Sequence, residues 1–163
     1  MKLEVYNKTH FSVFLNKHYL KGIDFNKMVN IEPFIKKIII NLNKYYNLNM
    51  NGYYNVFIYV NSLYGIVIEL MNIDDEYIKL FNKKIDMKIT FNLDSVFLFN
   101  SNDYFLLNEL KIQKKEIYYY ENGFYLNILN KKINNLLMMK LLECTEIIYG
   151  DKVYEILEYG KKL

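Results

Sequence analysis

The chain has 163 residues and a net charge of +3, a length typical of one domain or of two small ones. Charged residues interrupt every apolar stretch, so we expect no membrane-spanning helix. A single cysteine, Cys144, excludes an intrachain disulfide and a cysteine-rich zinc site. The N-terminus lacks the pattern of a secretory signal, so we expect a cytoplasmic protein. Alanine, arginine and tryptophan are absent, which is typical of an AT-rich genome.

The N-terminal region predicts a β hairpin followed by a helix. Apolar and polar residues alternate over residues 3–15 with a polar break at residues 7–9, which indicates two paired strands. Asn30 is the expected N-cap of the helix, with Glu32 in its first turn. The apolar residues of this helix recur at spacings of three and four: Ile31, Phe34, Ile35, Ile38, Leu42 and Tyr45.

A second pair of strands is expected at residues 56–60 and 66–70, and their nearly continuous hydrophobicity indicates central strands. Charged residues are frequent over residues 72–84, which we interpret as a short linker. We therefore predict an α+β fold with two small domains, residues 1–71 and 85–163, each built from a sheet and helices.

The clearest signal in the C-terminal half is a hairpin over residues 117–129. Its Asn-Gly pair at residues 122–123 is expected to supply the positive φ angles of a tight turn. A helix over residues 134–149 is expected to end at Gly150, a residue suited to the left-handed C-terminal position, and Asp151 to cap a final short helix. Two strands and a short helix are expected before the hairpin, at residues 87–91, 96–99 and 103–110.

No set of residues indicates catalysis or metal binding. His10 and His18 have no nearby group of further ligands, and the sequence contains no glycine-rich phosphate loop and no nucleophile elbow. Asp74, Asp75 and Glu76 are adjacent carboxylates in the expected linker, where such groups usually stay solvated. We therefore predict that the protein is not an enzyme and holds no cofactor or metal.

The charges are unevenly distributed along the chain. Residues 140–160 contain five acidic residues against two lysines, so the basic excess lies in the rest of the chain. Two interpretations remain open for this pattern. The acidic residues can be ordinary solvated helix faces, or they can form one end of a polarised interaction surface.

Eleven short segments, spread over nearly the whole chain, carry a resemblance to a known family. In the N-terminal half they are Met1–Glu4, Thr9–Leu15, Leu20–Ile23, Gly52–Val60 and Gly65–Ile68. In the C-terminal half they are Val96–Phe99, Asp103–Tyr104, Leu107–Leu110, Ile117–Leu126, Leu141–Gly150 and the Leu-Glu-Tyr-Gly-Lys ending at Leu157–Lys161. In this order the segments resemble the MecA family of bacterial adaptor proteins. The linker of this chain is shorter than the family usually has, and the chain is basic where family members tend to be acidic.

The resemblance implies an adaptor for regulated proteolysis. The N-terminal domain would capture substrate proteins, and the C-terminal domain would dock on an Hsp100-class AAA+ unfoldase of the ClpC type. The unfoldase, not this chain, would hydrolyse ATP. We expect the docking residues at the hairpin tip and at the acidic helical end: Tyr120, Asn122, Phe124, Glu146, Tyr149 and Asp151.

A ribosome- or nucleic-acid-binding module is the alternative. The basic N-terminal body could contact phosphates, and tyrosines on sheet faces could stack on bases. The absence of arginine disfavours this reading, because arginine is the better side chain for bidentate phosphate and base contacts. Binding that weakens steeply with salt would identify such a module.

Overall fold

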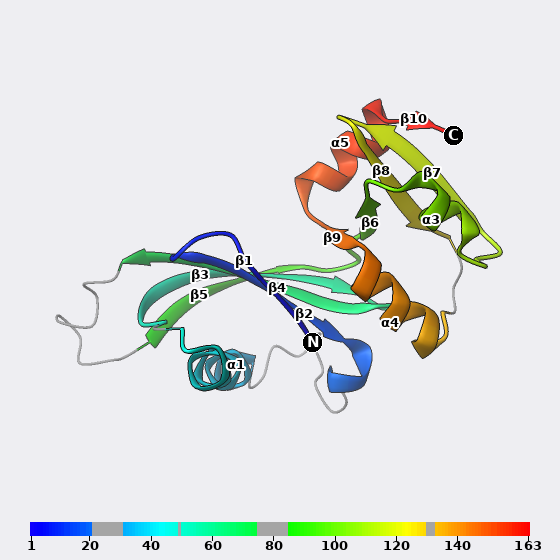
Figure 1. Ribbon diagram of the computed structural model, residues 1–163. Helices are drawn as coiled ribbons and strands as arrows, with labels where there is room; N and C mark the ends of the chain where they lie inside the picture. Colours follow the sequence, from blue (N-terminus) through cyan, green and yellow to red (C-terminus); the bar gives the residue numbers. More distant parts are fainter. Residues whose placement is uncertain (21–30, 49, 75–84, 130–132) are drawn as a thin grey trace. The chain divides into compact units, whose positions relative to one another are not determined.

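The chain forms two compact units, each with a five-stranded sheet and helices, which confirms the expected α+β fold (Figure 1). The first unit comprises Met1–Ile58 and Gly65–Asn92, and the second comprises Tyr59–Tyr64 and Leu93–Leu163. The computed structural model describes residues 1–20, 31–48, 50–74, 85–129 and 133–163.

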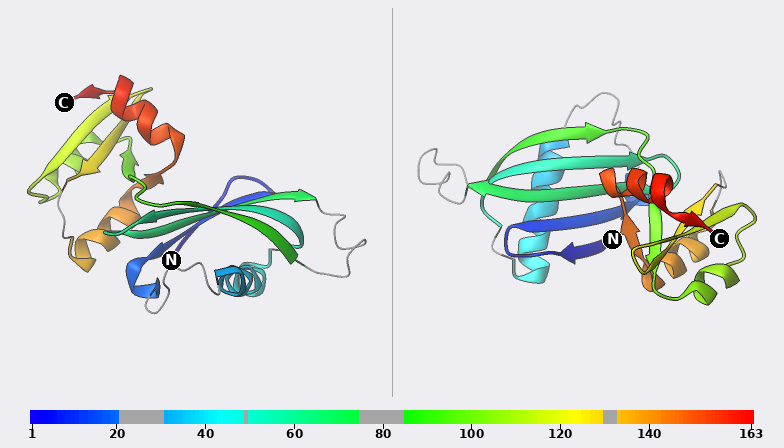
Figure 2. Two further views of the ribbon diagram at one scale, coloured as in Figure 1. Left: turned by 180° about the vertical axis from the view of Figure 1, so that it is seen from behind. Right: turned by 90° about the horizontal axis from the view of Figure 1, so that it is seen from above.

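The first sheet has the strand order β1-β2-β4-β3-β5. Its strands are β1 (Lys2–Val5), β2 (His10–Asn16), β3 (Gly52–Asn61), β4 (Gly65–Asp74) and β5 (Ile85–Asn92). The short 3₁₀ helix η1 (Lys17–Leu20) follows β2, and the helix α1 (Ile31–Tyr46) lies across one face of the sheet (Figure 2). Both expected hairpins are present, and β3 and β4 occupy inner positions as their hydrophobicity predicted.

Helix α1 buries one apolar stripe, formed by Ile31, Ile35, Ile38, Ile39 and Leu42. The expected stripe was shifted slightly around the helix, because it included Phe34 and Tyr45 and left out Ile39. At about 100° per residue, Ile39 lies at one border of the buried stripe, whereas Phe34 and Tyr45 fall beyond its opposite border. Tyr45 is accordingly 72% exposed. The expected N-cap, Asn30, lies outside the described residues.

Strand β5 belongs to the first sheet, where it lies beside β3 at the edge. The sequence pattern had assigned these residues to the start of a second domain that begins at residue 85. In the structure the C-terminal stretch of the second unit begins at Leu93 instead. Of the expected linker, residues 72–74 are the end of β4, and residues 75–84 lie outside the described part of the chain. Alternating polarity indicates a strand but does not say which sheet it joins.

The second sheet has the order β10-β7-β8-β6-β9. Its strands are β6 (Leu98–Ser101), β7 (Lys115–Tyr120), β8 (Gly123–Ile128), β9 (Glu146–Ile148) and β10 (Lys161–Lys162). Three described helices accompany it: α3 (Tyr104–Glu109), α4 (Asn135–Cys144) and α5 (Asp151–Tyr159). The expected short helix and the expected terminal helix correspond to α3 and α5.

The expected helix over residues 134–149 was too long, because α4 ends at Cys144 and β9 follows it. The backbone N–H and the hydroxyl of Thr145 both donate to the carbonyl oxygen of Leu141, at 2.9 and 2.6 Å, where the backbone becomes extended. Gly150, with φ of +69°, is therefore the N-cap of α5 rather than the C-terminal residue of a long helix, and Asp151 is the first residue of α5. Pairing of β9 with β6 is a long-range contact that helical periodicity does not reveal.

The β7–β8 hairpin was predicted correctly, but its turn is displaced by one residue. Glu121 and Asn122 have positive φ angles of 45° and 63°, and Gly123 pairs with Tyr120 as the first residue of β8. This φ pattern is typical of a type I′ turn. A side chain at position 123 would be crowded, because a Cβ there would lie 3.0 Å from the hydroxyl of Tyr125.

Tyr64 is a core residue of the second unit, although about thirty residues separate it from Leu93, where the longer stretch of that unit begins. It is 3% exposed, and its ring lies 5.4 Å from the ring of Phe99 and 6.3 Å from that of Phe97. Its hydroxyl donates to the carbonyl oxygen of Ile128 at 3.2 Å, and burial raises the pKa of Tyr64 to about 12. The second unit is thus built from two separate stretches of the chain.

Truncation of Tyr64 should destabilise the protein far more than truncation of an exposed tyrosine. We expect Tyr64→Ala to lower the free energy of unfolding by about 3–5 kcal/mol, the usual loss for a large buried aromatic ring. Tyr64→Phe, which loses only the hydrogen bond to Ile128, should cost about 1 kcal/mol. Urea unfolding followed by circular dichroism measures both. Tyr154→Ala, on the exposed side of α5, is the control, and a loss as large as that of Tyr64→Ala would contradict the assignment of Tyr64 to the core.

Candidate functional site

The β7–β8 hairpin sends its aromatic side chains to two opposite faces of the second sheet, because successive residues of a strand alternate in direction. Tyr118, Tyr120 and Tyr125 lie on one face, where they pack with Leu98 and with Val153 and Ile156 of α5. Tyr119 and Phe124, which are paired directly across the two strands, lie on the other face with Tyr104 of α3. One face is therefore covered by α5, and the other carries the aromatic rings beside α3.

Four aromatic rings form a continuous row on the face that carries α3. The ring centroids of Phe105 and Tyr104 are 5.8 Å apart, those of Tyr104 and Phe124 are 5.5 Å apart, and those of Phe124 and Tyr119 are 5.2 Å apart. Phe105 is 72% exposed and Tyr119 is 39% exposed, while the two rings between them are half-buried. We call these four residues the aromatic surface.

Polar contacts at both ends of α3 hold this short helix in place. The side chain of Asp103 caps the N-terminus by accepting from the backbone N–H of Leu106 at 3.1 Å. At the other end the ammonium group of Lys115 donates to three backbone carbonyl oxygens, those of Leu107, Asn108 and Leu110. Partial burial lowers the pKa of Lys115. Because Lys115 belongs to β7, it ties α3 to the hairpin that carries Tyr119 and Phe124.

On the opposite face, the hairpin tip and α5 are joined by a polar cluster of Tyr120, Glu121, Lys152 and Glu155. The hydroxyl of Tyr120 donates to the carboxylate of Glu155, and Lys152 lies 2.8 Å from Glu121 and 3.3 Å from Glu155. The ammonium group also lies 4.8 Å from the centre of the Tyr120 ring. The hydrogen bond from Tyr120 lowers the pKa of Glu155, and the two carboxylates raise the pKa of Lys152 to about 12.

Of the three residues expected at the hairpin tip, two lie at the aromatic surface. Phe124 is a member of it, and Asn122 accepts a hydrogen bond from the hydroxyl of Tyr119 at 3.1 Å. Tyr120 points to the other face and belongs to the polar cluster. Tyr104 and Phe105 were missed as site residues. The sequence does show two adjacent aromatic residues after the helix-capping Asp103, but the exposure of Phe105 is a tertiary property.

The three residues expected at the acidic helical end lie in three different settings. Glu146 is exposed at the start of the edge strand β9, opposite Asn100 of β6. The ring of Tyr149 lies 4.9 Å from the ring of Tyr59. Asp151 is exposed at the start of α5. The six expected residues therefore do not form one continuous surface.

Across the ranges that the structure describes, no three His, Cys, Asp or Glu side chains are grouped so that they could hold a metal ion. Within the same residues, no helix has the length and apolar character needed to cross a membrane. A scan against protein-family models, a search of curated proteins and a search of solved structures found no match. The aromatic surface is the feature of the second unit that most resembles a binding site.

The polar cluster predicts a specific pH response. Because Tyr120 donates to Glu155, the pKa of Glu155 lies below its ordinary value of 4.5, so the cluster contributes stability above that pH and loses it as the pH falls through the folded-state pKa. We expect Tyr120→Phe to raise the pKa of Glu155 toward 4.5, as measured by NMR titration of the carboxyl carbon. Tyr119→Phe removes a hydroxyl from the opposite face and should leave this pKa unchanged. An unchanged pKa in Tyr120→Phe would contradict the hydrogen bond.

Proposed function

We propose that this chain is a cytoplasmic adaptor of the MecA type, which recruits substrate proteins to an AAA+ unfoldase of the ClpC type for regulated proteolysis. In this proposal the second unit docks on the unfoldase through the aromatic surface, and the first unit carries the substrate protein. The adaptor itself is not an enzyme and needs no cofactor or metal, because the unfoldase hydrolyses the ATP.

The exposed row of aromatic rings is the observation that carries the proposal. Aromatic side chains are enriched at the energetic centres of protein interfaces, since each buries a large area at a small cost in side-chain entropy. Here the rings already contact one another, so little order has to be gained on binding. Phe105 is the most exposed member, and the hydroxyl of Tyr119 and the side chain of Asn122 supply a polar margin.

The order of elements adds support from the sequence. The segments that resemble the MecA family include Asp103–Tyr104, Leu107–Leu110 and Ile117–Leu126, which lie in α3 and in the β7–β8 hairpin. Three residues of the aromatic surface, Tyr104, Tyr119 and Phe124, belong to these segments. Phe105 belongs to α3 but lies between two of them.

The face of the second sheet that packs against α5 gives the nucleic-acid alternative little support. A base-stacking platform requires tyrosines that lie open on a sheet face. Tyr118, Tyr120 and Tyr125 share one face, but Val153 and Ile156 of α5 pack against that face. Its tyrosines are therefore parts of the core and of the polar cluster, and the open rings lie on the other face beside α3.

Removal of the Phe105 ring should weaken unfoldase binding without unfolding the second unit. We expect full-length Phe105→Ala to bind a purified ClpC-type unfoldase about tenfold more weakly than the unchanged protein, a loss typical of an aromatic residue at the centre of an interface. Biolayer interferometry measures the two affinities. Tyr154→Ala is the matched control, because Tyr154 is also an exposed aromatic residue of the second unit but belongs to α5.

Two outcomes would count against the proposal. Equal affinities of Phe105→Ala and the unchanged protein would remove the aromatic surface as the docking site. Failure of the unchanged protein to bind the unfoldase, together with salt-sensitive capture of ribosomal RNA from lysate, would replace the adaptor with the nucleic-acid-binding alternative.

A further inference from the structure

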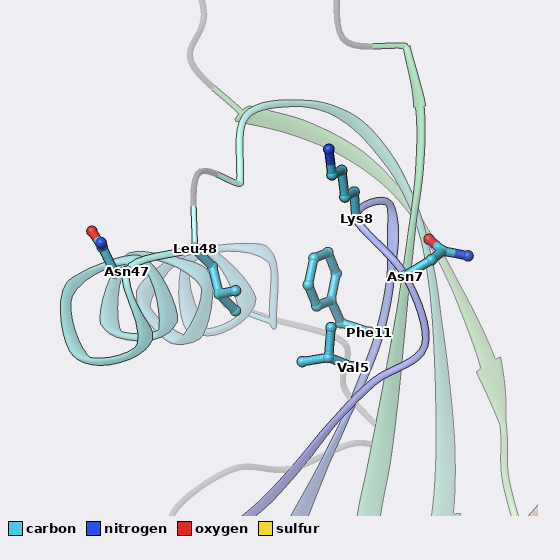
Figure 3. A pocket seen from close by; sticks show the side chains of 6 residues that line it. All are labelled: Val5, Asn7, Lys8, Phe11, Asn47 and Leu48. Carbon is cyan, nitrogen blue, oxygen red and sulfur yellow. The ribbon is translucent and has the colours of Figure 1, made fainter.

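The first unit contains a cavity of about 500 Å³ between the β1–β2 hairpin and the end of α1 (Figure 3). Val5 and Phe11, a directly opposed cross-strand pair, form one wall, and Leu48, just beyond α1, faces them. Phe11 is 3% exposed and Val5 is 53% exposed, so the cavity has an apolar floor and an open rim. Its volume falls within the range of natural ligand pockets.

The charge at this cavity has one sign. Among the described residues that line it, Lys8 is the one charged residue, and none is a carboxylate. Within the described part of the chain, Lys8 forms no ion pair or hydrogen bond. The backbone turn that carries Lys8 is held by the side chain of Asn7, which accepts from both the backbone N–H and the hydroxyl of Thr9, at 2.8 and 2.9 Å. The cavity therefore suits a ligand that joins an apolar group to a carboxylate.

The edge of the sheet leads directly to this cavity. Strand β1 is one of the two edge strands of the first sheet (Figure 2). Its last residue, Val5, lines the cavity (Figure 3). Among the described residues, no strand pairs with the outer edge of β1. An extended peptide can add to such an edge through main-chain hydrogen bonds and place alternate side chains in adjoining pockets. A small apolar acid would use the cavity but not the edge.

We propose that the first unit binds an extended peptide segment along the edge of β1, with an apolar side chain in the cavity and a neighbouring carboxylate on Lys8. The identification of this segment as part of a substrate protein rests on the proposed adaptor function. The binding itself is measured without an unfoldase, so the two proposals can fail separately.

A fluorescein-labelled threonine peptide with a central Leu-Thr-Asp sequence is the probe, because residues two apart in an extended strand point to the same side, and binding is measured by fluorescence anisotropy on the full-length protein. We expect it to bind more tightly than peptides with Ser-Thr-Asp or Leu-Thr-Lys at the same place. Lys8→Glu should weaken binding of the Leu-Thr-Asp peptide by at least about threefold and should favour the Leu-Thr-Lys peptide. Lys37→Glu is the matched control, because it makes the same change of net charge at an exposed position of α1.

Three outcomes would overturn the proposal. The first is an equal effect of Lys8→Glu and Lys37→Glu, which would show that only the net charge matters. The second is full binding of a peptide methylated at every main-chain nitrogen, which cannot donate hydrogen bonds to a strand edge. The third is complete displacement of the peptide by octanoate at a concentration equal to that of the peptide, which would assign the cavity to small apolar acids. Circular dichroism and urea unfolding confirm that both variants are folded.

Discussion

The register of the β7–β8 hairpin is the constraint on which the second unit depends. The turn at Glu121 and Asn122 pairs Tyr120 with Gly123 and therefore Tyr119 with Phe124. Since side chains alternate between the faces of a sheet, a slip of one residue would exchange the buried tyrosines for the exposed rings. The same register that completes the core beneath α5 thus presents the aromatic surface beside α3.

Polar side chains fix what surrounds this hairpin. Lys115 holds the end of α3 at one end of β7, and the cluster around Lys152 joins the hairpin tip to α5 at the other. Lysine makes both of these cationic contacts, because the chain contains no arginine. The result is a pair of short helices whose positions depend on hydrogen bonds to β7 as well as on buried apolar area.

The two proposed binding surfaces belong to different units and use different chemistry. The aromatic surface offers large preformed apolar area with a polar margin, which suits a folded partner. The cavity beside β1 offers a strand edge, a small apolar pocket and one cation, which suits an extended segment. An adaptor needs both kinds of site, because it must hold an unfoldase and a substrate at the same time.

Local periodicity and turn residues were enough to predict the fold class, both hairpins of the first sheet, the β7–β8 hairpin and the approximate places of α1, α3 and α5. The sequence also pointed to Phe124 and Asn122. It did not place β5 in the first sheet, end α4 at Cys144, bring Tyr64 into the second unit or expose Phe105. Those features were decided by the tertiary structure, because strand partners and burial depend on contacts between residues that are far apart in the sequence.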